Sequence, residues 1–115
     1  MSDHYRFGIV AGEKSGDILG ASLISALRNY FPNAEFIGVG GSEMVALGCE
    51  SLCPIDRLSV MGFVEPLRRL PELLTLKRKL RRRFLAERID AFIGIDSPVF
   101  NLSLAKALKN KGIKT

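Results

Sequence analysis

The chain alternates short apolar runs with longer stretches in which apolar residues recur at helical spacing. Three runs are typical of strands buried on both faces of a sheet: RFGIVA at 6–11, EFIGV at 35–39 and DAFIGI at 90–95. Three stretches predict helices: 18–31, 42–47 and 100–111. Two weaker strand signals are residues 50–53, which Pro54 limits, and residues 113–115, which follow a helix C-cap at Gly112. Parallel neighbours need a crossover connection, so this alternation predicts a doubly wound parallel α/β sheet.

The first predicted helix, residues 18–31, is preceded by polar residues that suit a helix start. Ser15 is available as an N-cap, and Asp17 falls in the first turn, where a negative charge interacts favourably with the helix dipole. The apolar stripe of this helix is predicted to consist of Leu19, Leu23, Ala26, Leu27 and Tyr30.

Length and composition are those of one ordinary globular domain. The chain has 115 residues, of which 47% are hydrophobic and 25% charged. No apolar run reaches the roughly 18 to 20 residues that span a bilayer, and the start MSDHYR lacks the apolar centre of a signal peptide, so a cytoplasmic location is expected. Cys49 and Cys53 are accompanied only by His4, too few ligands for a tetrahedral metal site, and are interpreted as buried free thiols.

Positive charge is concentrated in one segment of a chain whose formal net charge is +5. Residues 66–88 hold nine Lys and Arg against Glu72 and Glu87. Pro66 and Pro71 are predicted to divide this segment into a short helix and a longer one. The longer helix is predicted to cover the sheet with Leu73, Leu76, Leu80 and Phe84.

Further apolar side chains exceed what one buried stripe requires: Phe63, Val64, Leu67, Leu70 and Leu74. Together with cations such as Arg68 and Arg69, they suit a surface that places leucines among acyl chains and cations near anionic headgroups. The simpler interpretation is an amphipathic helix packed on the sheet. The segment lacks interleaved aromatic residues that stack on bases, so no nucleic-acid partner is expected.

Polar residues follow the first strand abruptly in VAGEKSGD, residues 10–17. In open α/β sheets, ligands bind at the carboxyl ends of the strands, where loops meet helix N-termini. Gly12 and Gly16 permit close approach of a ligand, and Ser15 can donate a hydrogen bond. The alternative is that Ser15 and Asp17 only cap the helix and the glycines only make the turn. Neither GxxxxGK[ST] nor GxGxxG is present after this strand, which argues against a P-loop or NAD site.

Asp96 ends another predicted strand, and Ser97 and Pro98 force the chain to leave the sheet there. Its carboxylate is therefore expected to face the same crevice as the GEKSGD loop. A carboxylate in such a place can accept a proton from a hydroxyl group within hydrogen-bond reach. The alternative is an Asx turn or a helix cap around Ser97 and Pro98.

Four motifs occur in the order and spacing of a known family: VAGEKSGD, GVGGSEM with LGCES, VMGFVE, and IGIDSPVFNL. Across Phe7–Thr115 the chain resembles the lipid-A-disaccharide synthases, inverting glycosyltransferases of the two-domain GT-B type. The resemblance implies that residues 1–115 form part of a Rossmann-like, acceptor-binding N-terminal domain, without the C-terminal domain for the UDP-sugar. It also implies that UDP-2,3-diacylglucosamine and 2,3-diacylglucosamine 1-phosphate give a β-1,6-linked disaccharide and UDP, with neither metal nor cofactor.

The same resemblance implies roles for individual residues. Asp96 matches the family's proposed catalytic base. Substrate-binding positions are implied at Gly12, Glu13, Ser15, Gly16 and Asp17. Glu13 and Asp17 are expected to orient sugar hydroxyls or to shape the site. Asn101 matches the end of a DxPDFN pattern and is expected to cap the following helix, whereas Val99 stands in place of the second aspartate of that pattern. Lipid-linked sugar substrates imply a peripheral location on the inner face of the bacterial inner membrane.

Two other classes of function stay open at this point. The chain could be a non-catalytic α/β module that binds lipid or an anionic membrane surface. It could also be a small nucleotide-binding α/β protein unrelated to lipids, which would bind a nucleotide tightly without any other domain.

Overall fold

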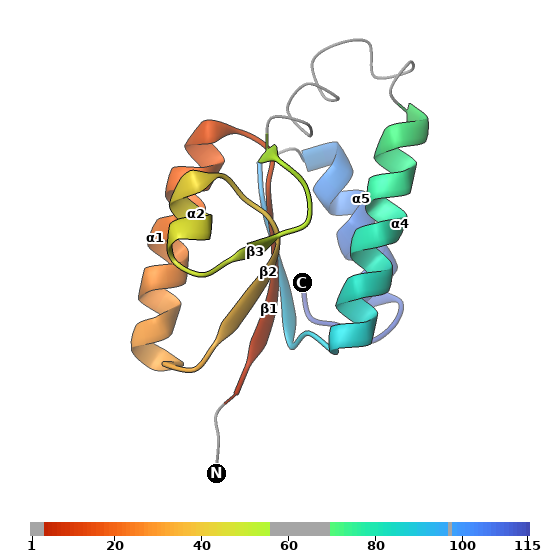
Figure 1. Ribbon diagram of the computed structural model, residues 1–115. Coiled ribbons are helices and arrows are strands. Elements are labelled where there is room, and N and C mark those ends of the chain that lie inside the picture. Colours follow the sequence, from red (N-terminus) through yellow and green to blue (C-terminus); the bar gives the residue numbers. More distant parts are fainter. Residues whose placement is uncertain (1–3, 56–69, 97) are drawn as a thin grey trace.

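The computed structural model of the protein describes residues 4–55, 70–96 and 98–115 (Figure 1). Four strands form one parallel sheet in the order β3-β2-β1-β4, with β1 at Arg6–Ala11, β2 at Glu35–Val39, β3 at Glu50–Ser51 and β4 at Ala91–Ile95. The helices described are α1 at Lys14–Tyr30, α2 at Ser42–Ala46, α4 at Leu70–Glu87 and α5 at Pro98–Lys109.

The β1 strand lies between β2 and β4 and pairs with both along nearly its whole length. Its register with β2 runs from Arg6 opposite Glu35 to Val10 opposite Val39, and its register with β4 ends at Ala11 opposite Ile95. The predicted strands at 6–11 and 35–39 have the observed bounds, and the strand predicted at 90–95 begins one residue later. The weak strand signals correspond to the two-residue β3 and to a single parallel bridge between Ala91 and Lys114.

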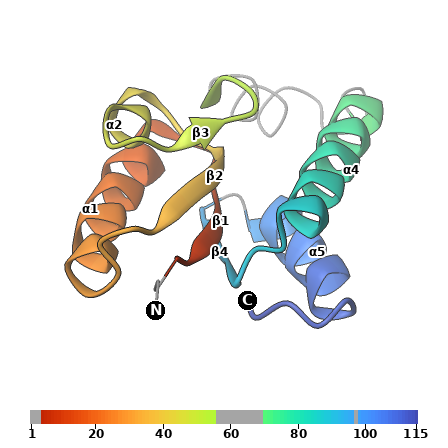
Figure 2. The same cartoon turned by 60° about the horizontal axis from the view of Figure 1, so that its bottom comes forward.

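Helices cover both faces of the sheet, as the doubly wound prediction requires. The α1 and α2 helices lie on one face and α4 and α5 on the other, as Figure 2 shows. Because side chains alternate along a strand, β1 supplies both cores: Ile9 is buried toward α1, and Val10 toward α4 and α5. The prediction of a doubly wound parallel α/β fold is therefore confirmed.

The apolar stripe predicted for α1 is correct only in part. Leu23 and Leu27 pack partly buried against the core, but Leu19 is 61% exposed and Tyr30 is 79% exposed. The helix packs through Gly16 and Gly20 and through Ile24, all of which are buried. A Cβ at Gly20 would lie 2.7 Å from Sδ of Met44, so this face approaches its neighbours too closely for the larger side chains.

The α4 helix follows the prediction where the structure describes it. Leu76, Leu80 and Phe84 are buried against the sheet, and Leu73 packs partly buried beside them. Pro71 falls in the first turn, where its missing N–H has no intrahelical acceptor to bond. The predicted short helix and the side chains of Phe63, Val64, Leu67, Arg68, Arg69 and Leu70 lie outside the described residues.

Ion pairs and hydrogen bonds tie α4 to its surroundings. The Arg83 guanidinium lies 2.9 Å from the Glu50 carboxylate on the edge strand β3 and 3.1 Å from that of Glu87. On the other side of the helix, Lys77 donates a hydrogen bond to Oγ of Ser103 in α5, at 2.5 Å. Among the described residues, no helix has both the length and the apolar character needed to cross a membrane.

Candidate active site at the carboxyl ends of β1 and β4

The direction of the chain changes between β1 and β4. After β1 the chain enters α1 on one face of the sheet, and after β4 it enters α5 on the opposite face (Figure 1). Such a topological switch point leaves a crevice at the carboxyl ends of the two strands, where ligands bind in open α/β sheets. The sequence predicted that the loops after these two strands converge, and the structure confirms it.

The Asp96 carboxylate connects the two strand ends. Its Oδ1 accepts a hydrogen bond from the backbone N–H of Gly12 at 2.6 Å, and its Oδ2 accepts one from Glu13 at 3.2 Å. These amides belong to the turn that leads from β1 into α1, so hydrogen bonds to the ionised carboxylate fix both the turn and the side chain. Asp96 as a whole is half-buried and not enclosed.

The first turn of α1 lies directly against this carboxylate. A Cβ built on Gly16 would stand 1.9 Å from Oδ2 of Asp96 and 3.3 Å from Cβ of Ala11. Gly16 has a helical backbone conformation that any residue can adopt. Glycine is needed there because Asp96 occupies the space that a side chain would fill. The structure thus brings Gly12, Glu13 and Gly16 together with Asp96, as the sequence predicted for this site.

The helix begins earlier than the sequence predicted. Glu13 is the N-cap residue, with no hydrogen bond from its side chain to the helix, and Ser15 lies exposed inside the first turn. The prediction of Ser15 as N-cap is therefore wrong, because a carboxylate from the neighbouring strand orders the turn instead. The exposed side chains of Glu13 and Ser15 remain available to a ligand at the mouth of the crevice.

Asp17 has a structural task that the sequence did not reveal. It is only 3% exposed, and its carboxylate accepts hydrogen bonds from the backbone N–H groups of Gly41, Glu43 and Met44 at 2.9, 3.0 and 2.9 Å. These amides lie at the start of α2, so Asp17 caps that helix from α1. Of the two predicted roles for Asp17, this geometry supports the shaping of the site.

Ser51 is hydrogen-bonded to Gly40, the first of the two glycines that follow β2. Its Oγ accepts a hydrogen bond from the N–H of Gly40 at 3.0 Å and lies 2.7 Å from the carbonyl oxygen of Cys53, to which it donates. Sequence reasoning did not find this contact, although Ser51 belongs to the LGCES motif and Gly40 to the GVGGSEM motif. The pairing of β2 with β3 brings the two motifs together.

Asn101 does not cap α5, contrary to the prediction. It lies inside the helix, is 5% exposed, and donates hydrogen bonds from Nδ2 to backbone carbonyls of both β1 and β4. The only signal for such a role in the sequence is the position of an amide side chain five residues after Asp96, which places it one turn into the next helix.

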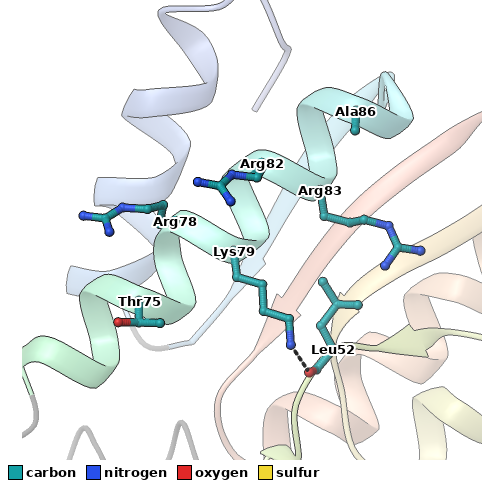
Figure 3. A pocket seen from close by; sticks show the side chains of 7 residues that line it. All are labelled: Leu52, Thr75, Arg78, Lys79, Arg82, Arg83 and Ala86. Carbon is teal, nitrogen blue, oxygen red and sulfur yellow. Dashed lines mark hydrogen bonds between the residues drawn. The ribbon is translucent and has the colours of Figure 1, made fainter.

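The structure has a hollow between α4 and the end of β3. This basic groove has a volume of about 590 Å³ and is lined by Leu52, Thr75, Arg78, Lys79, Arg82, Arg83 and Ala86 (Figure 3). Lys79 donates to the carbonyl oxygen of Leu52 at 3.3 Å, and Arg83 is held by its ion pairs. Within the part of the chain that the structure describes, Arg78 and Arg82 have no acceptor.

A parallel, doubly wound sheet with a carboxylate at its switch point defines a Rossmann-like ligand-binding domain. Within that class the chain belongs to the lipid-A-disaccharide synthetase family, whose model matches residues 7–115. It is 59% identical over 115 residues to the lipid-A-disaccharide synthase of Cellvibrio japonicus and 56% identical over 113 residues to that of Saccharophagus degradans. It spans about 30% of the length of these relatives.

Proposed function

We propose that this chain is the acceptor-binding part of a glycosyltransferase of lipid A biosynthesis. The donor would be UDP-2,3-diacylglucosamine and the acceptor 2,3-diacylglucosamine 1-phosphate, giving the β-1,6-linked lipid A disaccharide 1-phosphate and UDP. The observation that carries the proposal is the half-buried Asp96 carboxylate, held by two backbone amides at the switch point of the sheet. Membership of the synthetase family supports the reaction class.

In this proposal Asp96 is the general base. The acceptor hydroxyl donates a hydrogen bond to the carboxylate, and its oxygen attacks the anomeric carbon from the face opposite the UDP group. As the new C–O bond forms, the bond to UDP breaks and the hydroxyl proton passes to Asp96, so the configuration inverts. The N–H groups of Gly12 and Glu13 hold the carboxylate in place, which keeps the base oriented without blocking every lone pair.

The remaining site residues have supporting roles in the proposal. The exposed side chains of Glu13 and Ser15 contact the acceptor sugar, Gly12 holds Asp96 through its N–H, Gly16 allows the close approach of Asp96, and Asp17 maintains the adjacent loop. Residues 1–115 supply the acceptor side, and the UDP-sugar is bound by the part of the relatives that this chain does not span. The proposed reaction requires no metal or cofactor.

The test uses a chimera in which this chain replaces the matching 115 residues of the Cellvibrio japonicus relative. UDP release from the two lipid substrates is measured for the chimera, for Asp96→Asn and for Glu43→Gln, an exposed carboxylate that undergoes the same chemical change. We expect Glu43→Gln to match the chimera and Asp96→Asn to lose at least about 100-fold in kcat. An active Asp96→Asn variant would refute the assignment of the base, and an inactive chimera would favour a non-catalytic lipid-binding module.

The basic groove supports a second part of the proposal, contact with an anionic membrane surface. Arg78 and Arg82 lie four residues apart on α4, so their guanidinium groups reach the same side of the helix. Leu74, on the same helix, is 49% exposed. Cations beside an exposed leucine suit a surface with lipid phosphates above an apolar layer. The proposed location is therefore peripheral, on the cytoplasmic face of the bacterial inner membrane.

Vesicle co-sedimentation tests the membrane contact. The chain should sediment with vesicles rich in anionic lipid and remain in solution with zwitterionic vesicles. The double variant Arg78→Gln, Arg82→Gln should bind anionic vesicles at least about threefold more weakly, whereas Lys106→Gln, Lys109→Gln on α5 removes the same charge elsewhere and should bind almost normally. Equal losses in the two variants would show that only net charge matters and would remove the groove from the proposal.

A further inference from the structure

We infer that Asn101 is the positioning residue for Asp96: its buried amide holds the Asp96 backbone in the conformation that presents the carboxylate to the crevice. The inference rests on the proposed function only where it concerns catalysis. Its structural part concerns how the ends of β1 and β4 are joined, and it can be tested without any substrate.

Asp96 adopts an unusual backbone conformation. Its φ is +54°, in the left-handed region, which is uncommon for residues other than glycine although aspartate enters it more readily than most. The last regular pair between β1 and β4 is Ala11 opposite Ile95. One residue further on, the N–H of Gly12 bonds to the Asp96 side chain rather than to a backbone carbonyl. Because the backbone turns at Asp96, the side-chain carboxylate of Asp96, and not a backbone carbonyl of β4, accepts the hydrogen bond from Gly12 just beyond the regular pairing of β1 and β4.

The amide of Asn101 donates to backbone carbonyl groups on both sides of this turn. Nδ2 lies 2.7 Å from the carbonyl oxygen of Asp96 and 3.3 Å from those of Val10 and Ile95. Chemistry fixes the orientation of the side chain, because the opposite one would place Oδ1 against three carbonyl oxygens. Oδ1 itself has no hydrogen-bond partner within the described ranges. Asn101 therefore acts at this site as a hydrogen-bond donor, through Nδ2.

Close packing leaves Asn101 little freedom to move. Its side chain stands over Gly94 of β4, where a Cβ would lie 2.9 Å from Cβ of Asn101 and 3.1 Å from its Cγ. Asn101 is also 95% buried, since only 5% of it is exposed. A residue so enclosed does not touch a substrate in the crevice, so any effect on the reaction must act through Asp96.

Loss of the amide should therefore affect the chemical step and not substrate binding. Without Nδ2 the Asp96 carbonyl loses its donor, the φ of Asp96 can relax, and the carboxylate can leave the N–H groups of Gly12 and Glu13. In the chimera, we expect Asn101→Ala to lower kcat by about 10- to 100-fold, while both KM values stay within about twofold. Ala105→Gly, on the same helix but away from Asp96, is the control for loss of helix stability and should keep its kcat.

A double-mutant cycle separates positioning from general damage. In an Asp96→Asn background, Asn101→Ala should lower the residual rate by less than about twofold, because the group through which it acts is already lost. A full further loss in that background, or an unchanged kcat in the single variant, would overturn the inference. If Asn101→Ala does not fold, Asn101→Ser keeps one donor in a smaller side chain, and the same cycle is run with it.

Amide hydrogen exchange tests the inference independently of the proposed function. The amides of Gly12 and Glu13 should exchange at least about tenfold faster in Asn101→Ala than in the unmodified protein, and the amides of Gly41 and Met44, which Asp17 holds, should be unchanged. Unchanged protection of Gly12 would overturn the inference whatever Asp96 does in catalysis. Faster exchange together with an active Asp96→Asn variant would keep the structural link and reject only the assignment of the base.

Discussion

Gly16→Ala tests the close contact between α1 and Asp96. In most helices this change stabilises, by about 0.5 to 1 kcal/mol, because alanine has the better helix propensity. Here the new methyl group would stand 1.9 Å from Oδ2 of Asp96, far inside contact distance. The carboxylate is the movable partner, and it can yield only by giving up its hydrogen bond from Glu13, or those from both Glu13 and Gly12.

The expected change in the free energy of unfolding is the cost of the clash with Asp96 minus the gain in helix propensity. A hydrogen bond to a charged group contributes about 1.5 to 3 kcal/mol, and overpacking typically costs about 1 to 3 kcal/mol. After subtraction of the gain in helix propensity, we expect Gly16→Ala to lower the free energy of unfolding by about 2 kcal/mol. Urea unfolding of the chain, followed by circular dichroism, measures this change as a lower midpoint at an unchanged slope.

The same substitution in an Asp96→Ala background is the critical comparison. There the methyl group meets no carboxylate, so Gly16→Ala should become neutral or stabilising, with a coupling energy of about 2 kcal/mol between the two positions. Ser15→Ala, exposed one residue earlier in the helix, should change stability by less than about 0.5 kcal/mol in either background. Stabilisation by Gly16→Ala in the unmodified protein would refute the contact on which the site is built.

Three further predictions concern the framework around the site. Asp17→Asn should lower the free energy of unfolding by about 2 kcal/mol in urea melts, because an amide cannot accept from three N–H donors; a loss below about 0.5 kcal/mol would contradict its role as a cap. Leu80→Ala should cost about 2 to 5 kcal/mol in the same assay, whereas Leu74→Ala should cost little, since Leu80 is fully buried and Leu74 is 49% exposed; equal costs would contradict the packing of α4. Burial raises the pKa of the Cys49 thiol to about 11 from its usual value of 9.0. The stability that the protonated thiol contributes is fully present below pH 9 and is lost as the pH rises through 11, about 3 kcal/mol in all. Unfolding measured from pH 8 to 11 should therefore show a shallower decline for Cys49→Ala than for the unmodified protein, and parallel declines would contradict that shift.

Hydrophobic patterning predicted the strands well because β1, β2 and β4 are short runs buried on both faces. It was only partly right for α1, where Leu23 and Leu27 pack against the core but Leu19 and Tyr30 are exposed. The helix packs through Gly16 and Gly20, and glycine carries no hydrophobic signal. Whether a glycine marks a turn or a close contact depends on what lies opposite, here Asp96 and Met44, and local sequence does not contain that information.

The candidate site was predicted in position but not in its contacts. Asp96 and the loop after β1 were expected to meet, because parallel strands end at the same edge of a sheet. The partners of the carboxylates were not predictable by local capping rules. Asp96 orders α1 from 80 or more positions away in the chain, and Asp17 caps α2 across 24 to 27 positions. Only the pairing of β1 with both β2 and β4 brings these groups together.

The central claim is that Asp96 acts as the base in glycosyl transfer, and a single-turnover measurement tests it most directly. The chimera or its Asp96→Asn variant, in excess over a limiting amount of the UDP-sugar donor, is mixed with saturating acceptor, and the disaccharide product is followed by rapid quench, which separates chemistry from binding and release. We expect a rate lower by about 100- to 10,000-fold for Asp96→Asn with donor affinity unchanged. A rate within tenfold of the unmodified chimera would contradict it.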